Sequence, residues 1–339
     1  MIKKKTFLWA CLITALVGLC FAGLGLALGI QNIGRTTKGW VRVPTSDYMA
    51  AQQELPAFDS LYLDMDLSRV ELIPSDHYAL DYNLPLQPNG QAVDIRQDGG
   101  ALRISHQNDS FKYLDTINFG WLPRSNHRSD YIQITYDASK PLKLVDVKVS
   151  VGDVHLNGVD AEALSVYAAL GKVEYSGTAA NASFKLDCGD FVGTVQADTA
   201  KLQVSLGAAK LTGSHIGQFT ATMDCGDFSF KQGSLLGGSI TQSLGNIRLE
   251  DADIANMTLE SDCGDISIAG AVTGNTTIRL DLGDINLTTR LPLSSYSYKV
   301  DMDLGNLQID GQRASASGGQ GPNRLDIDSS TGDVRLYFN

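Results

Sequence analysis

The chain has little cysteine, little histidine and no excess of basic residues. Its 339 residues include five cysteines and five histidines, and its formal net charge is −11 at pH 7. Two of the cysteines lie in an apolar N-terminal stretch, which excludes a framework of disulfides. The acidic balance argues against nucleic acid and anionic lipid headgroups as partners. The histidines are scattered, and there is no His-Glu-x-x-His, Gly-x-Ser-x-Gly, Walker or dinucleotide motif. The sequence therefore predicts no catalytic residues.

One short motif recurs from about residue 147 to the end of the chain. It reads apolar-x-apolar-x-(Leu or Cys)-Gly-Asp-apolar-x-apolar, and successive glycines are 18 or 19 residues apart, except for 22 and 27 at the end. Apolar residues alternate on both sides of the glycine, which is typical of two short strands joined at a corner that requires glycine. The anchoring glycines are Gly152, Gly171, Gly189, Gly207, Gly226, Gly245, Gly264, Gly283, Gly305 and Gly332.

A unit of this length cannot bury its own apolar face, whereas units stacked on one another can. The predicted fold class is therefore all-β: a parallel β-solenoid (β-helix) of about 19-residue coils over residues 146–339. Neighbouring coils should lie about 4.8 Å apart, so about ten coils give a stack about 50 Å long.

The residue before the glycine alternates between cysteine and leucine along several coils. Cys188, Cys225 and Cys263 should lie about 9.6 Å from one another, too far apart for disulfides. We expect them to be buried small hydrophobes in the core. For the same reason, Leu244→Asp is expected to unfold the domain, because it would bury an unpaired charge.

The N-terminal segment has the composition of a membrane anchor. Residues 1–5 carry three lysines, and the 25 residues 6–30 carry no charge. That length can span a bilayer, and the lysines should stay cytoplasmic. We predict a cytoplasmic tail (1–5), a single-pass anchor in the cell membrane (6–30), a linker (31–54) and an extracellular C-terminal domain. A cleaved signal peptide is the alternative. A homodimer through the anchor is a further hypothesis, because small residues recur at suitable spacing: Gly18, Ala22, Gly25 and Gly29.

Residues 55–145 are predicted to form an N-terminal β cap that contains a first coil-like unit. Residues 61–72 repeat the coil pattern with Ser68 in the place of the glycine. The strand-like runs that follow should cover the end of the stack, where an open edge invites pairing. Leu325–Phe338 is expected to be the last coil. Between two runs of the cap lies an aromatic loop with three candidate partner-binding residues: Tyr113, Phe119 and Trp121.

Aspartates flank the glycine in several coils, two residues before it and one after it. Two adjacent coils both carry this pair, which should bring four carboxylates together: Asp262, Asp265, Asp281 and Asp284. Ca²⁺ prefers oxygen ligands, so these residues are a candidate calcium site, and Ca²⁺ is the one candidate cofactor. The alternative is that the aspartates cap turns on a solvated face.

The Gly-Asp-(Val, Ile or Phe)-x-(Leu or Ile) coils, the early unit and the N-terminal span resemble the bacterial adhesin-like β-strand repeat family DUF4097, over about residues 57–339. The resemblance implies a β-helical surface domain linked with adhesion or envelope stress, without catalytic residues to carry over. The predicted function is a membrane-anchored, adhesin-like binding or scaffold protein whose partner is an envelope protein or a glycan. A sensor or regulatory partner in the envelope stress response is the alternative, and a carbohydrate-active β-helix enzyme is the third reading. A groove of outward aromatics with Arg or Lys across several coils would favour a glycan.

Overall fold

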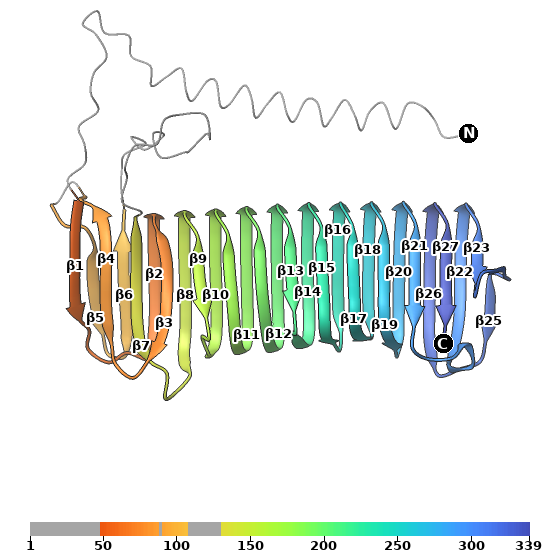
Figure 1. The fold of residues 1–339 in the computed structure, drawn as a ribbon, viewed down its shortest axis with the longest axis horizontal. Helices are drawn as coiled ribbons and strands as arrows, with labels where there is room; N and C mark the ends of the chain where they lie inside the picture. The colour runs from red at the N-terminus through yellow and green to blue at the C-terminus, as the bar shows by residue number, and fades with distance from the viewer. Residues whose placement is uncertain (1–47, 88–89, 108–129) are drawn as a thin grey trace, which may run out of the picture. The chain divides into compact units, whose positions relative to one another are not determined.

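The computed structural model describes residues 48–87, 90–107 and 130–339. Ser46–Asn339 forms one compact unit, in which parallel strands stand side by side along one axis (Figure 1). Each coil contributes one strand before its corner and one strand after it, so two parallel ladders run the length of the stack. The predicted all-β class is confirmed, and the parallel stacking of coils follows from the strand register.

The ladder formed by the strands before the corner contains, in spatial order, β6 (Ala101–His106), β2 (Ser60–Leu67), β8 (Leu142–Val151), β10 (Ala161–Leu170), β11 (Val173–Cys188), β12 (Phe191–Leu206), β14 (His215–Cys225), β16 (Gly238–Leu244), β18 (Met257–Cys263), β20 (Asn275–Leu282), β26 (Asn323–Thr331) and β22 (Tyr296–Leu304).

The ladder formed after the corner contains β7 (Tyr131–Asp137), β3 (Arg69–Ser75), β9 (Val154–Asn157), the first parts of β11 and β12, β13 (Ala209–Thr212), β15 (Phe228–Leu235), β17 (Ile247–Ala255), β19 (Ile266–Thr273), β21 (Ile285–Thr289), β27 (Val334–Phe338) and β23 (Leu307–Ile309).

The core is one continuous column of apolar side chains that both ladders contribute. In the coil of Gly283, the side chains of Ile278, Leu280, Ile285 and Leu287 are at most 1% exposed. These are the inward positions that the alternation predicts for strands with one buried face. Stacking coils therefore buries the apolar face that one coil alone would leave in water.

The residue before the glycine is the exception, and its predicted burial is wrong. Leu206, Leu244 and Leu282 are about half exposed, at 53%, 48% and 48%. The cysteines of the same column are partly exposed and free: Cys188, Cys225 and Cys263. The pairing between neighbouring strands is interrupted at the residue two before the glycine. Alternation ends at that interruption, and the following side chain points away from the core.

The corner glycines are required by close contact between coils as well as by their backbone angles. Gly226 has φ of +136°, and a Cβ built on it would lie 1.9 Å from the carbonyl oxygen of Gly207 in the neighbouring coil. Only glycine fits such an approach at a positive φ. Ser68 takes this place in the first coil of the chain and is not among the residues with positive φ.

Chain order and spatial order differ at both ends of the stack. β26 pairs with both β20 and β22, so Leu325–Phe338 forms the second-to-last coil and not the last one (Figure 1). At the other end, β2 pairs with both β6 and β8, so the first coil in the chain also lies inside the stack. At the N-terminal end the chain goes from β2 and β3 to the outer strands β6 and β7 before it continues with β8. At the C-terminal end it forms the outer strands β22 and β23 before it returns to form β26 and β27.

Antiparallel strands and one short turn complete the two ends. β1 pairs with β4, β4 with β7 and β5 with β6 at the N-terminal end, and β25 with β22 and β24 with β23 at the C-terminal end. β1 occupies part of the predicted linker. The bounds of these elements are β1 (Tyr48–Glu54), β4 (Ala79–Pro85), β5 (Asp94–Asp98), η2 (Leu293–Ser295), β24 (Gln312–Arg313) and β25 (Ser317–Gly319).

The predicted cytoplasmic tail (1–5), the membrane anchor (6–30), the linker up to residue 47 and the aromatic loop with Tyr113, Phe119 and Trp121 lie outside the described residues. In the part of the chain that the structure describes, no helix has the length and apolarity needed to cross a bilayer.

Candidate functional site

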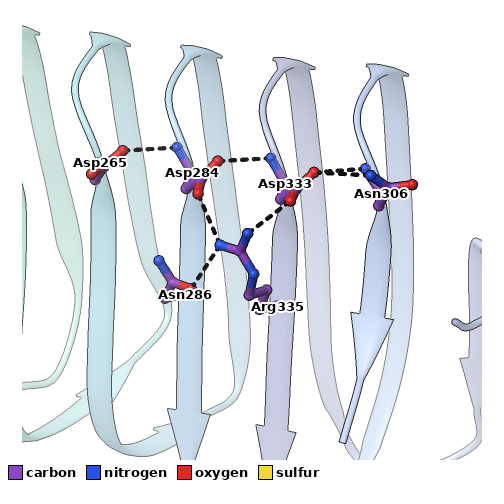
Figure 2. Close-up of polar contacts among 6 residues, drawn as sticks. All are labelled: Asp265, Asp284, Asn286, Asn306, Asp333 and Arg335. Atoms are coloured by element: carbon purple, nitrogen blue, oxygen red, sulfur yellow. Dashed lines mark hydrogen bonds and ion pairs between the residues drawn. The ribbon is translucent and has the colours of Figure 1, made fainter. Parts of the chain in front are cut away.

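The residue after the corner glycine forms a ladder of hydrogen bonds from coil to coil. Its side-chain oxygen accepts the backbone N–H of the equivalent residue in the next coil. The first acceptor and donor pairs are Asp227 with Asn246 (2.8 Å) and Asn246 with Asp265 (2.9 Å). Figure 2 shows the pairs that follow: Asp265 with Asp284 (2.9 Å), Asp284 with Asp333 (2.9 Å) and Asp333 with Asn306 (3.1 Å). These side chains cap the corners, as the alternative to a calcium site predicts, because backbone N–H groups there need acceptors.

Arg335 of β27 lies against the C-terminal part of this ladder. Its guanidinium donates to Asp284 at 2.8 Å and to Asp333 at 2.7 Å, and it faces the side-chain oxygen of Asn286 at 3.5 Å (Figure 2). The pKa of Asp284 lies below its usual value, mainly because Arg335 donates to the carboxylate and also because the N–H of Asp333 does so. Asp284 is therefore held ionised by protein donors.

The four aspartates of the predicted calcium site do not gather around one point. Asp265 and Asp284 follow their corners and belong to the ladder, whereas Asp262 and Asp281 precede their corners and are exposed on β18 and β20. Nowhere in the described residues do three or more His, Cys, Asp or Glu side chains come together in a way that suits a metal ion. At Asp265 and Asp284, carboxylate oxygens already accept backbone N–H groups, and Arg335 also donates to Asp284.

The exposed residues before the glycines form a continuous column, which we call the corner ridge. Parallel register places each member beside the next one: Val151, Leu170, Cys188, Leu206, Cys225, Leu244, Cys263 and Leu282. The valine and the four leucines are between 38% and 53% exposed. Single exposed apolar residues are ordinary, whereas a contiguous row of them is a candidate surface for binding another molecule. Sequence reasoning named this column but assigned it to the core.

A groove of about 560 Å³ lies at the N-terminal end of the stack, across β5, β6, β2 and β8. The guanidinium of Arg103 stands 3.8 Å from the centre of the Tyr62 ring. Ion pairs line the same groove, with Arg96 2.6 Å from Asp94 and Lys148 3.8 Å from Asp146. Sequence reasoning missed these residues, because only the pairing of β2 with β6 brings Tyr62 and Arg103 together.

Comparison with known proteins gives one family and several distant structures. A family model described as Toastrack DUF4097 matches residues 58–337. No curated protein gives a significant match.

Solved structures that align with the chain include a "putative adhesin" from Parabacteroides distasonis ATCC 8503, at 11% identity over 85% of this chain and 97% of that chain, with a TM-score of 0.39. A "putative adhesin" from Parabacteroides merdae ATCC 43184 aligns at 10% identity over 85% and 95%, with a TM-score of 0.41. A "Putative lipid binding protein" from Parabacteroides distasonis ATCC 8503 aligns at 13% identity over 86% and 96%, with a TM-score of 0.32.

Proposed function

We propose that this chain, which belongs to the Toastrack DUF4097 family, is a binding or scaffold module without catalytic activity. In this proposal residues 6–30 anchor it in the cell membrane and the solenoid is displayed outside the cell. The observation that supports binding most directly is the corner ridge, an exposed apolar column on a stack whose coils are hydrogen-bonded throughout. A stack of this kind keeps outward side chains at fixed spacing, which suits the presentation of a surface.

The acidic side chains near the ridge support a structural role more than a catalytic one. Catalytic carboxylates need an open position for a substrate. Asp265 and Asp284 instead accept backbone N–H groups, and Arg335 also holds Asp284. Their arrangement stabilises corners without leaving oxygens directed at a common point.

Glycan binding in the N-terminal groove is a second candidate function. The groove combines Tyr62 with Arg103, Arg96 and Lys148 across four strands, which is the combination that favours a glycan. An aromatic ring offers an apolar face, and the charged groups around it offer donors and acceptors for hydroxyl groups.

Membrane display can be tested in cells that express the full chain or a version lacking residues 6–30. We expect the full chain in the membrane fraction and accessible to protease added to intact cells, and the deleted version in the soluble fraction. Recovery of the full chain in the soluble fraction, or its protection in intact cells, would contradict the proposal.

Glycan binding can be tested by applying the full chain, embedded in lipid nanodiscs, to an array of envelope glycans. We expect binding that Arg103→Ala abolishes and that Lys201→Ala, at an exposed position on the same ladder, leaves unchanged. An array without signal would exclude the groove as a glycan site and leave the scaffold role in place. Activation of an envelope stress reporter by the chain, without any glycan signal, would instead support the regulatory alternative.

A further inference from the structure

The corner ridge combines an apolar surface with acidic side chains on both sides. We propose that it is the docking site for a basic amphipathic helix of a partner protein. This inference rests on the proposed binding function and specifies the chemistry of the partner. It concerns a different surface from the N-terminal groove, so either site can fail without the other.

The ridge is not required by the core, which makes it available to a partner. Leu206, Leu244 and Leu282 keep about half of their surface in water, whereas the side chains two positions earlier are buried inside the stack. Burying the exposed half of several leucines removes apolar surface from water, and this gives a driving force for association.

The charges beside the ridge define which partner fits. Aspartates lie on both sides of the ridge, in alternate coils at first and then in two adjacent ones, with Ser205, Ala208, Ser243 and Asn246 at the same positions in the coils between. They are Asp187, Asp224, Asp262 and Asp281 before the corner and Asp190, Asp227, Asp265 and Asp284 after it. A second copy of the chain would place acidic rows against acidic rows, and an anionic lipid surface would be repelled in the same way. A partner whose apolar stripe has Lys and Arg on both sides complements the site.

The backbone of the ridge excludes an added strand and favours a helix. The backbone groups at the corners are already paired between coils, for example the N–H of Gly189 with the carbonyl of Leu206 (2.8 Å) and the N–H of Gly226 with the carbonyl of Leu244 (2.9 Å). Strand addition needs free backbone groups, whereas a helix satisfies its own and presents only side chains.

The alternation of leucine and cysteine gives the ridge a spacing that a helix can match. Each cysteine is shorter than the leucines beside it, so Cys188, Cys225 and Cys263 form notches two coils apart, at intervals of about 9.6 Å. Residues seven apart on a helix are separated by about 10.5 Å along its axis, which is close to this interval, so a helix that lies along the ridge can place side chains at neighbouring notches. The column from Val151 to Leu282 is about 34 Å long, which corresponds to a helix of about 22 residues.

The experiment uses the full chain in nanodiscs of zwitterionic phosphatidylcholine and two labelled 22-residue model peptides. One peptide repeats leucine at helical spacing with lysine on either side, and the other carries glutamate in place of lysine. Fluorescence anisotropy, corrected for empty nanodiscs, measures binding. We expect the lysine peptide to bind and the glutamate peptide not to bind. The double variant Leu206→Ser with Leu244→Ser should weaken binding by at least about tenfold.

Three further variants separate the ridge from general attraction to an acidic protein. Cys225→Leu fills a notch with the side chain that the neighbouring coils tolerate, and we expect it to weaken binding although it adds apolar surface. Asp224→Asn with Asp262→Asn should also weaken binding and make it less sensitive to salt. Val192→Ser, at a position 36% exposed on the other ladder, is the matched control and should have no effect.

Several results would overturn the proposal. These are no binding of the lysine peptide, equal binding of both peptides, binding that is indifferent to the leucine variants, and binding that Cys225→Leu leaves unchanged or strengthens. Self-association of the chain that is lost on Leu206→Ser would assign the ridge to a second copy instead. Failure of the ridge removes one support for the binding role, but membrane display and glycan binding in the groove have their own readouts, so failure of the ridge and failure of the proposed function are distinguishable.

Discussion

The strictest requirement in the stack is the glycine at each corner, and Gly226→Ala tests it. The added Cβ would lie 1.9 Å from the carbonyl oxygen of Gly207, and the backbone has φ of +136°. Relieving the overlap requires the two coils to separate by about 1 Å, which weakens the neighbouring hydrogen bonds from Gly207 to Cys225 (3.0 Å) and from Ala209 to Asp227 (2.9 Å). Two hydrogen bonds at about 1 kcal/mol each and backbone strain of about 1–3 kcal/mol give a loss of about 3–5 kcal/mol.

Urea unfolding followed by far-UV circular dichroism measures this loss, with Gly311→Ala as the control. Gly311 has φ of +76° with no heavy atom within 4 Å of a built Cβ, so its substitution should cost only about 1 kcal/mol. In Gly226→Ala we expect a lower midpoint, or two transitions if the stack divides at the altered coil. Equal effects of the two substitutions would refute the close contact between corners.

Four further outcomes are expected. Leu244→Asp should barely change the thermal midpoint, because Leu244 is half exposed. Leu249→Asp, at a side chain with 0% exposure, should unfold the chain because it buries an unpaired carboxylate. Equal melting of the two variants would contradict the exposure of the ridge. Asn246→Ala removes a corner acceptor and should cost about 0.5–1.5 kcal/mol in urea unfolding, while Asn246→Asp should retain most of that stability. Burial lowers the pKa of His106 in the folded chain. The free energy of unfolding should therefore be at its full value above about pH 6.5, the pKa of histidine in an unfolded chain, and should fall as the pH drops through that value, because the unfolded state then binds the proton more readily. His106→Gln should lack this fall when the free energy of unfolding is measured against pH. Millimolar Ca²⁺ should leave the thermal midpoint unchanged, and a rise of several degrees would restore the calcium site.

Much of the architecture is present in the local pattern of the chain. The recurrence of glycine, with apolar residues alternating on both sides, predicts the corners, the two strands of each coil and the inward positions such as Ile278 and Ile285, which are buried. The aspartates beside the glycine were predicted either to cap turns or to bind calcium. Both readings depend on the same oxygens, and in the structure the side-chain oxygens after the glycine accept backbone N–H groups from coil to coil.

The remaining features depend on how strands pair, which the pattern of one coil does not contain. The outward direction of Leu244 follows an interruption of the register between neighbouring coils. The groove exists because pairing places Arg103 beside Tyr62, although the two residues belong to different parts of the chain.

The sequence by itself determined the repeat, the glycine corners and the parallel stack, because each of these arises from residues within one coil and its immediate copy. The tertiary structure decided the order of coils at the two ends, where β26 enters between β20 and β22. It also decided which apolar column remains in water. Coils of similar sequence can stack in more than one order and with more than one strand register. The contacts between neighbouring coils therefore select the arrangement.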